Sequence, residues 1–282
     1  MAALSNNAFI LFRKYIYEQC GIDIDENKSY LIETRLSKLL IDSGLDSFEA
    51  LYTLLERNRD ARITAKVIDA ITTNETFWFR NEKPWQIMEE EWLPKACEVL
   101  RSGAKKRIRI WSAAASTGQE IYSTVMCIDN YLKLHNIKDI TLEHFEFYAT
   151  DISSSVIDIA RNGMYDSISI MRGLPGGYKQ RYFTQSGHIW SINDYIKKQV
   201  KFETFNLQNS FIFMGKFDLI FCRYVLIYFS DELKTDIFKK MIQIMNKESM
   251  LFIGTSEIYY SMDSFFKKIY AKDSIYYMPK EG

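Results

Sequence analysis

The chain has 282 residues, of which 47% are apolar and 26% charged, and its 36 basic and 36 acidic side chains give a formal net charge of zero. The apolar content supports a sizeable core and excludes a disordered chain, and the balanced charge argues against a broad electrostatic grip on nucleic acid. The four cysteines are scattered without a C-x-x-C pair, so they indicate neither a metal site nor a disulfide framework. No segment approaches about 18 consecutive apolar residues and no signal-peptide pattern is present, which predicts a cytoplasmic protein without membrane insertion.

Residues 5 to 80 are predicted to form helices only. Apolar side chains recur at helical spacing in four segments, namely Phe9 to Cys20, Lys28 to Ser43, Phe48 to Leu55 and Ile63 to Ile71. Gly21 and Gly44 end the first two segments, and Ser47 can cap the third. A helical module of this size is typical of binding or packing.

A junction of polar and aromatic residues follows the fourth helix, with the sequence Thr72-Thr-Asn-Glu-Thr-Phe-Trp-Phe-Arg80. The aromatic residues can be explained as a plug that packs the two domains together. Asn74, Thr76 and Arg80 are harder to explain by packing, because buried polar groups need hydrogen-bond partners. An arginine beside aromatic rings can also bind a carboxylate in a bidentate manner.

From residue 84 onward the pattern alternates between helices and strands. Helices are expected at 84–100, at 120–134 and after Ser153, and strands at 107–112, 144–150, 217–223 and 250–256. This alternation predicts a mostly parallel sheet with helices on both faces. The glycine-rich interval from Gly163 to Phe205 predicts a small antiparallel insertion whose last run, 200–205, can rejoin the main sheet. Residues 265–278 can form a closing antiparallel pair.

The segment from Ile110 to Tyr122 joins a strand to a helix through small residues, Ala113 to Gly118. Such a turn lets a ligand approach the backbone beside a helix N-terminus, although a tightly packed turn would look the same. Gly118 is its only glycine, so the dinucleotide fingerprint is absent. Asp151 and Arg223 end neighbouring strands, where parallel sheets bind ligands, and an acidic residue there can accept hydrogen bonds from ribose hydroxyls. A helix cap is the ordinary alternative for Asp151, but the three features together favour a nucleoside-containing ligand.

Five segments, taken together and in order, resemble the CheR family of chemotaxis receptor methyltransferases. They are Thr72 to Arg80, Ile110 to Glu120, Ala149 to Ile152, Asn206-Leu207 and Phe217 to Phe229. The resemblance implies a Rossmann-like α/β methyltransferase domain at residues 81–282, with a small all-helical domain at 1–80 and an antiparallel β insertion at about 164–200. It also implies a bacterial signal-transduction enzyme that transfers a methyl group from S-adenosylmethionine to glutamates of methyl-accepting chemotaxis receptors, leaving S-adenosylhomocysteine.

The resemblance also implies which residues form the site. Those expected to bind the cofactor are Asn74, Thr76, Arg80, Glu120, Asp151, Asn206, Leu207, Cys222 and Arg223. Arg80 and Tyr228 are expected closest to methyl transfer. The chemistry agrees, because a glutamate carboxylate with a pKa of about 4.3 is already ionised at neutral pH and needs no general base. The cofactor carries the activated methyl group, so the protein mainly supplies positioning, and no metal is expected.

The sequence departs from the family pattern in two segments. Gln119 and Ile121 flank Glu120 where Glu-Glu-Pro is common, and Tyr224 follows Arg223 where the family usually has asparagine. Tyr224 therefore either supplies a different contact or weakens cofactor binding.

The second helix carries Lys28, Arg35 and Lys38 within about one quadrant at 3.6 residues per turn. A solvated surface is the ordinary explanation for such a face. The functional alternative is that it meets a glutamate-rich receptor helix, as the resemblance also suggests. We expect a monomer whose partner is the cytoplasmic helical region of a receptor and not nucleic acid. The competing functions are a methyltransferase for another substrate, a cofactor-binding regulator without methyl transfer, and a structural adaptor.

Overall fold

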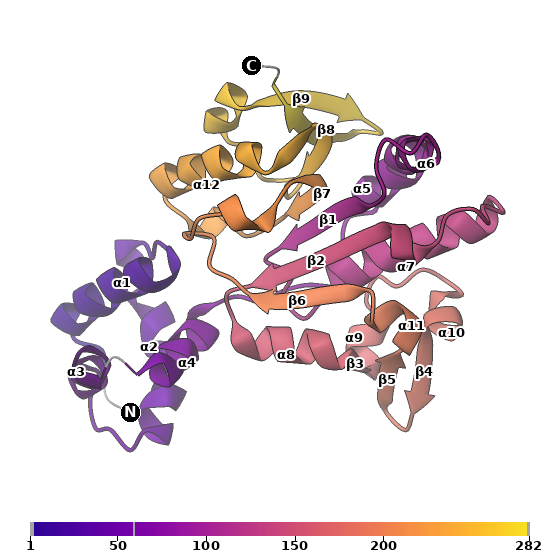
Figure 1. The fold of residues 1–282 in the computed structure, drawn as a ribbon. Helices are drawn as coiled ribbons and strands as arrows, with labels where there is room; N and C mark the ends of the chain where they lie inside the picture. Colours follow the sequence, from indigo (N-terminus) through magenta and orange to yellow (C-terminus); the bar gives the residue numbers. More distant parts are fainter. Residues whose placement is uncertain (1–2, 59, 281–282) are drawn as a thin grey trace.

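The computed structural model describes residues 3–58 and 60–280. Its N-terminal part is a cluster of helices, and the rest is built around a seven-stranded sheet (Figure 1). Among these described residues, no helix combines the length and the apolar character needed to cross a bilayer.

The N-terminal helices are α1(Asn6–Cys20), α2(Ser29–Asp42), α3(Phe48–Asn58) and α4(Ala61–Ile71). Ser5 caps α1 by accepting a hydrogen bond from the amide of Ala8, and Gly21 ends it with a left-handed φ of 75°. The four helices enclose one apolar core. The predicted helices are present, except that a 3₁₀ turn, η1(Glu26–Lys28), precedes α2. Lys28 therefore lies just before α2 and not within it.

The main sheet has the strand order β6-β2-β1-β7-β8-β10-β9. Its strands are β1(Ile108–Ala113), β2(Phe145–Asp151), β6(Val200–Thr204), β7(Phe217–Cys222), β8(Met245–Phe252), β9(Phe266–Ala271) and β10(Ser274–Pro279). The first five strands in that order pair in parallel, and β10 and β9 are antiparallel. The parallel sheet and its closing antiparallel pair are as predicted. The strand expected at 250–256 instead ends at Phe252, because Gly254 begins a turn held by the carboxylate of Glu257.

Helices cover both faces of the main sheet because its strand residues alternate between two cores. Ile110 packs with the helices on one face, and Trp111 packs with those on the other. The first face carries α5(Glu82–Ile87), the π-helical segment η2(Met88–Trp92), α6(Leu93–Arg101), α7(Gln119–Leu134) and α8(Ser154–Asn162), and the second carries α12(Asp231–Gln243). The helix expected at 84–100 is thus present, with a π-helical turn inside it.

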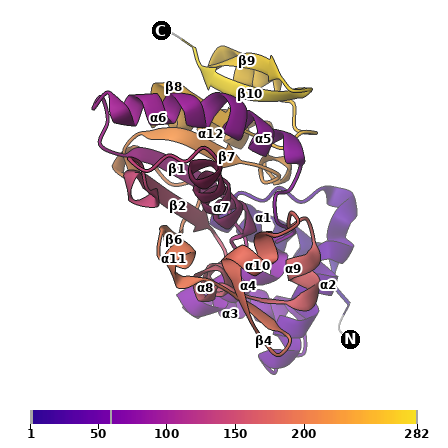
Figure 2. The same ribbon diagram turned by 90° about the vertical axis from the view of Figure 1, so that its right-hand side faces the viewer.

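The predicted antiparallel insertion is a three-stranded sheet of order β3-β5-β4. Its elements are β3(Met164–Asp166), α9(Ser167–Met171), α10(Tyr178–Tyr182), β4(Phe183–Ser186), β5(Ile189–Ile192) and α11(Asp194–Lys197). Figure 2 shows this insertion beside α7, and the buried rings of Tyr165 and Tyr182 belong to the same core as that helix. The next strand, β6, rejoins the main sheet parallel to β2.

Candidate functional site

A pocket lies at the carboxyl ends of the parallel strands, on the side where the helical cluster meets the sheet. It is lined by the linker that follows α4, the loops that follow β1, β2, β6 and β7, and the end of α1: Cys20, Ile22, Thr72, Thr73, Asn74, Glu75, Thr76, Arg80, Ala114, Ala115, Ser116, Glu120, Asp151, Ile152, Phe205, Asn206, Leu207, Arg223, Tyr224, Val225, Tyr228 and Phe229. The order β2-β1-β7 places this pocket where the chain continues in opposite directions from the central strand, as expected for a ligand site in an open α/β sheet.

The loop after β1 is held in an unusual backbone conformation. Ala114 and Ser116 have φ values of 61° and 50°, a region that L-residues adopt at a cost. Hydrogen bonds offset that cost, because Ala115 donates its amide to the carbonyl of Thr150 at 2.8 Å and Ser116 donates its amide to Asp151 Oδ2 at 2.8 Å. The small side chains thereby leave the backbone of this loop open to the pocket.

Asp151 is the last residue of β2 and is buried. Its Oδ1 accepts the amide of Ser153 at 3.0 Å, so with Ser116 on Oδ2 each carboxylate oxygen takes one backbone donor. Burial raises the pKa of Asp151, and these backbone hydrogen bonds oppose that shift. Asp151 therefore shapes the loop after β1, and each of its oxygens keeps a further lone pair for a ligand.

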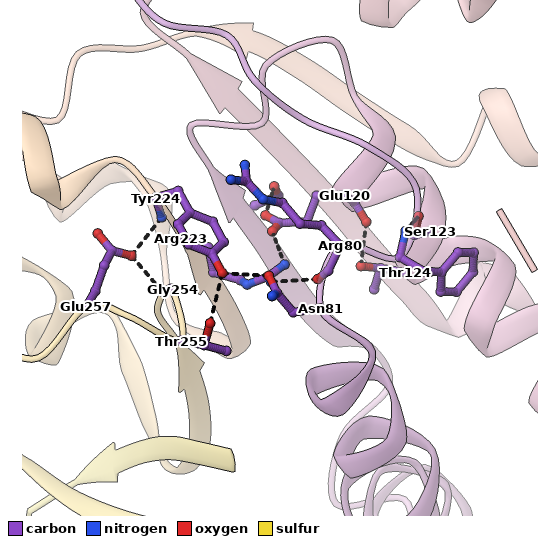
Figure 3. A network of polar contacts seen from close by, with 12 residues as sticks. Arg80, Asn81, Glu120, Ser123, Thr124, Arg223, Tyr224, Gly254, Thr255 and Glu257 are labelled. Carbon is purple, nitrogen blue, oxygen red and sulfur yellow. Dashed lines mark hydrogen bonds and ion pairs between the residues drawn. The ribbon is translucent and has the colours of Figure 1, made fainter. Parts of the chain in front are cut away.

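Glu120 and Arg223 form a buried ion pair at the back of the pocket (Figure 3). Glu120 Oε2 lies 2.9 Å from Arg223 Nη1, and their side chains are 12% and 1% exposed. The other carboxylate oxygen of Glu120 accepts the hydroxyl of Ser112 at 2.7 Å. Arg223 Nη2 donates to the carbonyl of Arg80 at 2.6 Å and to Asn81 Oδ1 at 2.8 Å. The pair thus ties α7, β1 and β7 to the linker.

The linker from Thr72 to Arg80 forms one wall of the pocket. The hydroxyl of Ser116 donates to the carbonyl of Asn74 at 2.9 Å, and Arg80 Nη1 donates to the carbonyl of Glu75 at 2.6 Å. Trp78 is fully buried and donates its indole N–H to the carbonyl of Ser169 at 3.0 Å. Trp78 also packs against Tyr165 and Phe183, so it anchors the linker in the β insertion and does not join the helical cluster to the sheet.

The helical cluster closes the pocket through contacts that the sequence did not indicate. Ile22 pairs with Phe229 as an isolated antiparallel β-bridge, and the amide of Asp23 donates to the carbonyl of Tyr228 at 2.8 Å. Asn206 Nδ2 donates to the carbonyl of Gln19 at 2.9 Å. Because these contacts join residues 187 to 207 positions apart, no local pattern predicts them.

The predicted residues that line the pocket are Asn74, Thr76, Arg80, Glu120, Asp151, Asn206, Leu207, Arg223 and Tyr228. Cys222 does not line it. This residue is fully buried in the core on the α12 face of the sheet, and burial raises the pKa of its thiol well above the ordinary value. The expectation that Cys222 contacts the cofactor is corrected, because β7 directs its side chain into the core and the chain reaches the pocket only at Arg223.

Arg35 is also placed differently from the prediction. Its guanidinium donates to the carbonyls of Ile71 and Thr72, the latter at 2.9 Å, and to the hydroxyl of Thr73 at 2.9 Å. Arg35 therefore clamps the start of the linker and has few donors left for a partner protein. Lys28 and Lys38 are exposed, lie outside the pocket lining, and have no charged partner among residues 3–58 and 60–280.

Comparison with protein families identifies the family of the chain that forms this pocket. Residues 74–275 match the CheR methyltransferase SAM-binding domain, and residues 7–72 match the CheR methyltransferase all-alpha domain. The chain belongs to the CheR methyltransferase family. It is 37% identical over 277 residues to chemotaxis protein methyltransferase 1 of Pseudomonas aeruginosa, which covers 98% of this chain and 99% of that protein.

Other relatives agree with that assignment. The chain is 36% identical to chemotaxis protein methyltransferase Cher2 of Pseudomonas putida, over 98% of each protein. It is 37% identical to the chemotaxis protein methyltransferase of Borreliella burgdorferi, over 86% of this chain and 85% of that one. The predicted family, the predicted methyltransferase activity in chemotaxis and the predicted cofactor, S-adenosylmethionine, are confirmed.

The solved structures that the chain matches are more distant. A TehB-like SAM-dependent methyltransferase from Corynebacterium glutamicum is 11% identical, with a TM-score of 0.36, over 71% of this chain and 100% of that chain. The glycopeptide N-methyltransferase MtfA, complexed with S-adenosylmethionine, is 9% identical, with a TM-score of 0.32, over 56% of this chain and 48% of that one. Likeness at this level assigns no residue a role.

The pocket fits S-adenosylmethionine by the chemistry of its walls. A buried carboxylate, Asp151, suits ribose hydroxyls, and the small residues after β1 leave room for the ligand. Arg80 lines the pocket and forms no ion pair with any described residue, so its guanidinium can meet a carboxylate. No cluster of metal-ligating side chains occurs in residues 3–58 and 60–280.

Proposed function

We propose that this enzyme methylates glutamate side chains of methyl-accepting chemotaxis receptors, producing glutamate methyl esters for chemotactic adaptation. The supporting observation is that Arg80, Asp151 and Tyr228 converge on one pocket in a chain that matches chemotaxis protein methyltransferases over nearly its full length. A methyltransferase for another substrate, or a regulator without methyl transfer, is the less favoured alternative.

The reaction requires the protein to position the glutamate and the cofactor more than to supply acid–base chemistry. An ionised glutamate is the nucleophile, and the bound cofactor supplies an activated methyl group. We assign Arg80 to holding a carboxylate, either that of the cofactor or that of the glutamate. Tyr228 lines the same pocket, and its hydroxyl has no hydrogen-bond partner within the described part of the chain. That hydroxyl is therefore available to orient the incoming glutamate.

The remaining pocket residues are assigned to the cofactor. We propose that Asp151 accepts hydrogen bonds from the ribose hydroxyls. The other assigned residues act as pocket walls, partly through the protein contacts described above: Asn74, Thr76, Glu120, Asn206, Leu207 and Arg223.

The test is to incubate the enzyme with S-adenosylmethionine and a receptor cytoplasmic fragment, and to locate the added methyl group by peptide mass spectrometry. We expect it on glutamate side chains and expect mild alkali to remove it, because methyl esters are base-labile. Methylation confined to lysine, arginine or a terminus would refute the proposal.

For the receptor contact we propose the exposed pair of Lys28, just before α2, and Lys38, within α2, without Arg35. Exposed ion pairs are worth only about 0.2–1 kcal/mol each, so reversing both lysines should raise the Michaelis constant for receptor by roughly 2- to 30-fold at low salt. The effect should shrink as salt rises, because exposed charges are screened over about 8–10 Å. Arg35 is unsuitable for this test because its loss would also disturb the linker.

The matched control is the double reversal Lys106→Glu with Lys138→Glu. Both lysines are exposed. They precede the N-terminal ends of β1 and β2, whereas the pocket lies at the carboxyl ends of these strands. If Lys28→Glu with Lys38→Glu behaves like this control, the face beside α2 is only a solvated surface.

We further propose that the enzyme acts as a cytoplasmic monomer on the helical region of the receptor, with its helical domain at 1–80 and its catalytic domain at 81–282. Sedimentation of the purified enzyme would test the monomer.

A further inference from the structure

Tyr224 occupies a backbone position that suits its residue type poorly. It directly follows Arg223 at the end of β7 and has a φ of 59°, in the left-handed region. Glycine and asparagine adopt this conformation readily, whereas an aromatic residue there is strained. Tyrosine at this position therefore needs contacts that offset the strain.

The hydroxyl and the backbone amide of Tyr224 both make such contacts (Figure 3). Its hydroxyl donates to Asn81 Oδ1 at 2.6 Å and lies 3.0 Å from the hydroxyl of Thr255. Its amide donates to Glu257 Oε2 at 2.7 Å, and the same oxygen accepts the amide of Gly254 at 2.6 Å. The ring also requires Gly254, because a Cβ there would lie 2.8 Å from two ring carbons. The strained residue is thus locked in place from both ends.

The face of the locked ring carries the guanidinium of Arg80. The central carbon of that group lies 3.8 Å from the centroid of the Tyr224 ring and 5.4 Å from the centroid of the Phe77 ring. The only hydrogen bond that the Arg80 side chain makes with a described residue is to the carbonyl of Glu75. Two aromatic rings and one carbonyl therefore fix this cation without neutralising it, which leaves its other N–H groups for a ligand.

We infer that Tyr224 is a positioning residue of this enzyme: its ring holds the Arg80 guanidinium ready to meet a carboxylate in the pocket. The inference rests on the proposed role of Arg80. It answers the question that the sequence left open, because Tyr224 supplies a cation–π contact where the family usually has an asparagine amide. The hydrogen bonds of Tyr224 and its ring contact with Arg80 offset the backbone strain at this position.

The test measures S-adenosylhomocysteine affinity, together with kcat and KM for receptor methylation, in Tyr224→Phe, Tyr224→Leu and Tyr224→Asn. Loss of a cation–π contact of the usual strength should lower kcat/KM by about 2- to 30-fold in Tyr224→Leu and Tyr224→Asn. Tyr224→Phe keeps the ring and should rescue most of that loss. Tyr224→Asn also relieves the strained backbone, so it should retain or raise the melting temperature while losing activity. Tyr260→Leu, which removes an aromatic ring that is 92% exposed, is the matched control.

A double-mutant cycle separates positioning from folding. In an Arg80→Ala background, Tyr224→Leu should cause no further loss in kcat/KM, because the group it positions is already gone. Equal losses with and without Arg80, a Phe variant as defective as the Leu variant, or an Asn variant with wild-type activity would each overturn the inference. Absence of methyl transfer in the wild-type enzyme would instead refute the proposed function and leave the effect of Tyr224 on S-adenosylhomocysteine affinity to be measured directly.

Discussion

The buried ion pair between Glu120 and Arg223 gives the sharpest prediction of stability. Replacing Arg223 by methionine keeps an unbranched apolar stem but removes the contacts with Glu120, with the carbonyl of Arg80 and with Asn81. The carboxylate of Glu120, only 12% exposed, would keep a single partner, the hydroxyl of Ser112. Breaking a buried pair in this way costs about 3–5 kcal/mol, which corresponds to a melting temperature lower by roughly 6–20 °C.

The loss should be smaller when the buried charge is removed as well. Glu120→Gln with Arg223→Met leaves no unpaired carboxylate, so the double variant should be more stable than Arg223→Met alone by at least about 1 kcal/mol. The assay is urea unfolding followed by tryptophan fluorescence. All five tryptophans lie outside the helical cluster, so the signal reports on the α/β domain: Trp78, Trp85, Trp92, Trp111 and Trp190. A cost below about 1 kcal/mol for Arg223→Met, or a double variant less stable than it, would refute the reasoning.

Four further predictions concern three side chains of the pocket. Asp151→Ala should weaken S-adenosylhomocysteine binding by roughly 10- to 150-fold, the effect of losing a charge-assisted hydrogen bond of about 1.5–3 kcal/mol, and calorimetry showing unchanged affinity would remove Asp151 from the site. Burial raises the pKa of Asp151, so its contribution to the free energy of unfolding is present below the ordinary aspartate pKa and is lost as the pH rises through the folded-state pKa. Asp151→Asn should therefore remove this pH dependence of the free energy of unfolding, as measured by urea unfolding in a pH series. Tyr228→Phe should lower kcat more than S-adenosylhomocysteine affinity, and equal losses would make Tyr228 a general part of the pocket wall. Burial raises the pKa of the Cys20 thiol to about 11, so iodoacetamide should label this pocket residue slowly at neutral pH and faster as the pH approaches that value, whereas rapid labelling at neutral pH would contradict its burial.

The sequence was most informative where local pattern and sheet topology act together. The carboxyl ends of parallel strands meet at one edge, so Asp151 and Arg223 were expected beside the loop after β1, and they do line one pocket. The alternation of helices and strands likewise gave the sheet and its insertion. Local pattern does not fix the end of β8, because the turn that stops this strand depends on hydrogen bonds that the Glu257 carboxylate accepts from the amides of Tyr224 and Gly254.

The remaining features depend on contacts between distant segments. Cys222 and Arg223 are adjacent in sequence, and only the direction of each side chain at the strand end decides which one reaches the pocket. Arg35 fits an exposed basic face by helical spacing, but it meets linker carbonyls that lie 36 and 37 positions further along the chain. The closure of the pocket by Ile22 and the stacking of Arg80 on Tyr224 likewise arise from tertiary docking, which carries no local signal.

We propose that this pocket transfers a methyl group from S-adenosylmethionine to receptor glutamates. The most direct measurement incubates the enzyme with methyl-labelled S-adenosylmethionine and receptor-containing membranes, and then counts the volatile label released by alkali. The wild-type enzyme should give alkali-released label that depends on receptor, and Arg80→Ala should lose most of it while remaining folded. Label that stays bound through alkali, or an equal signal from membranes without receptor, would contradict the account.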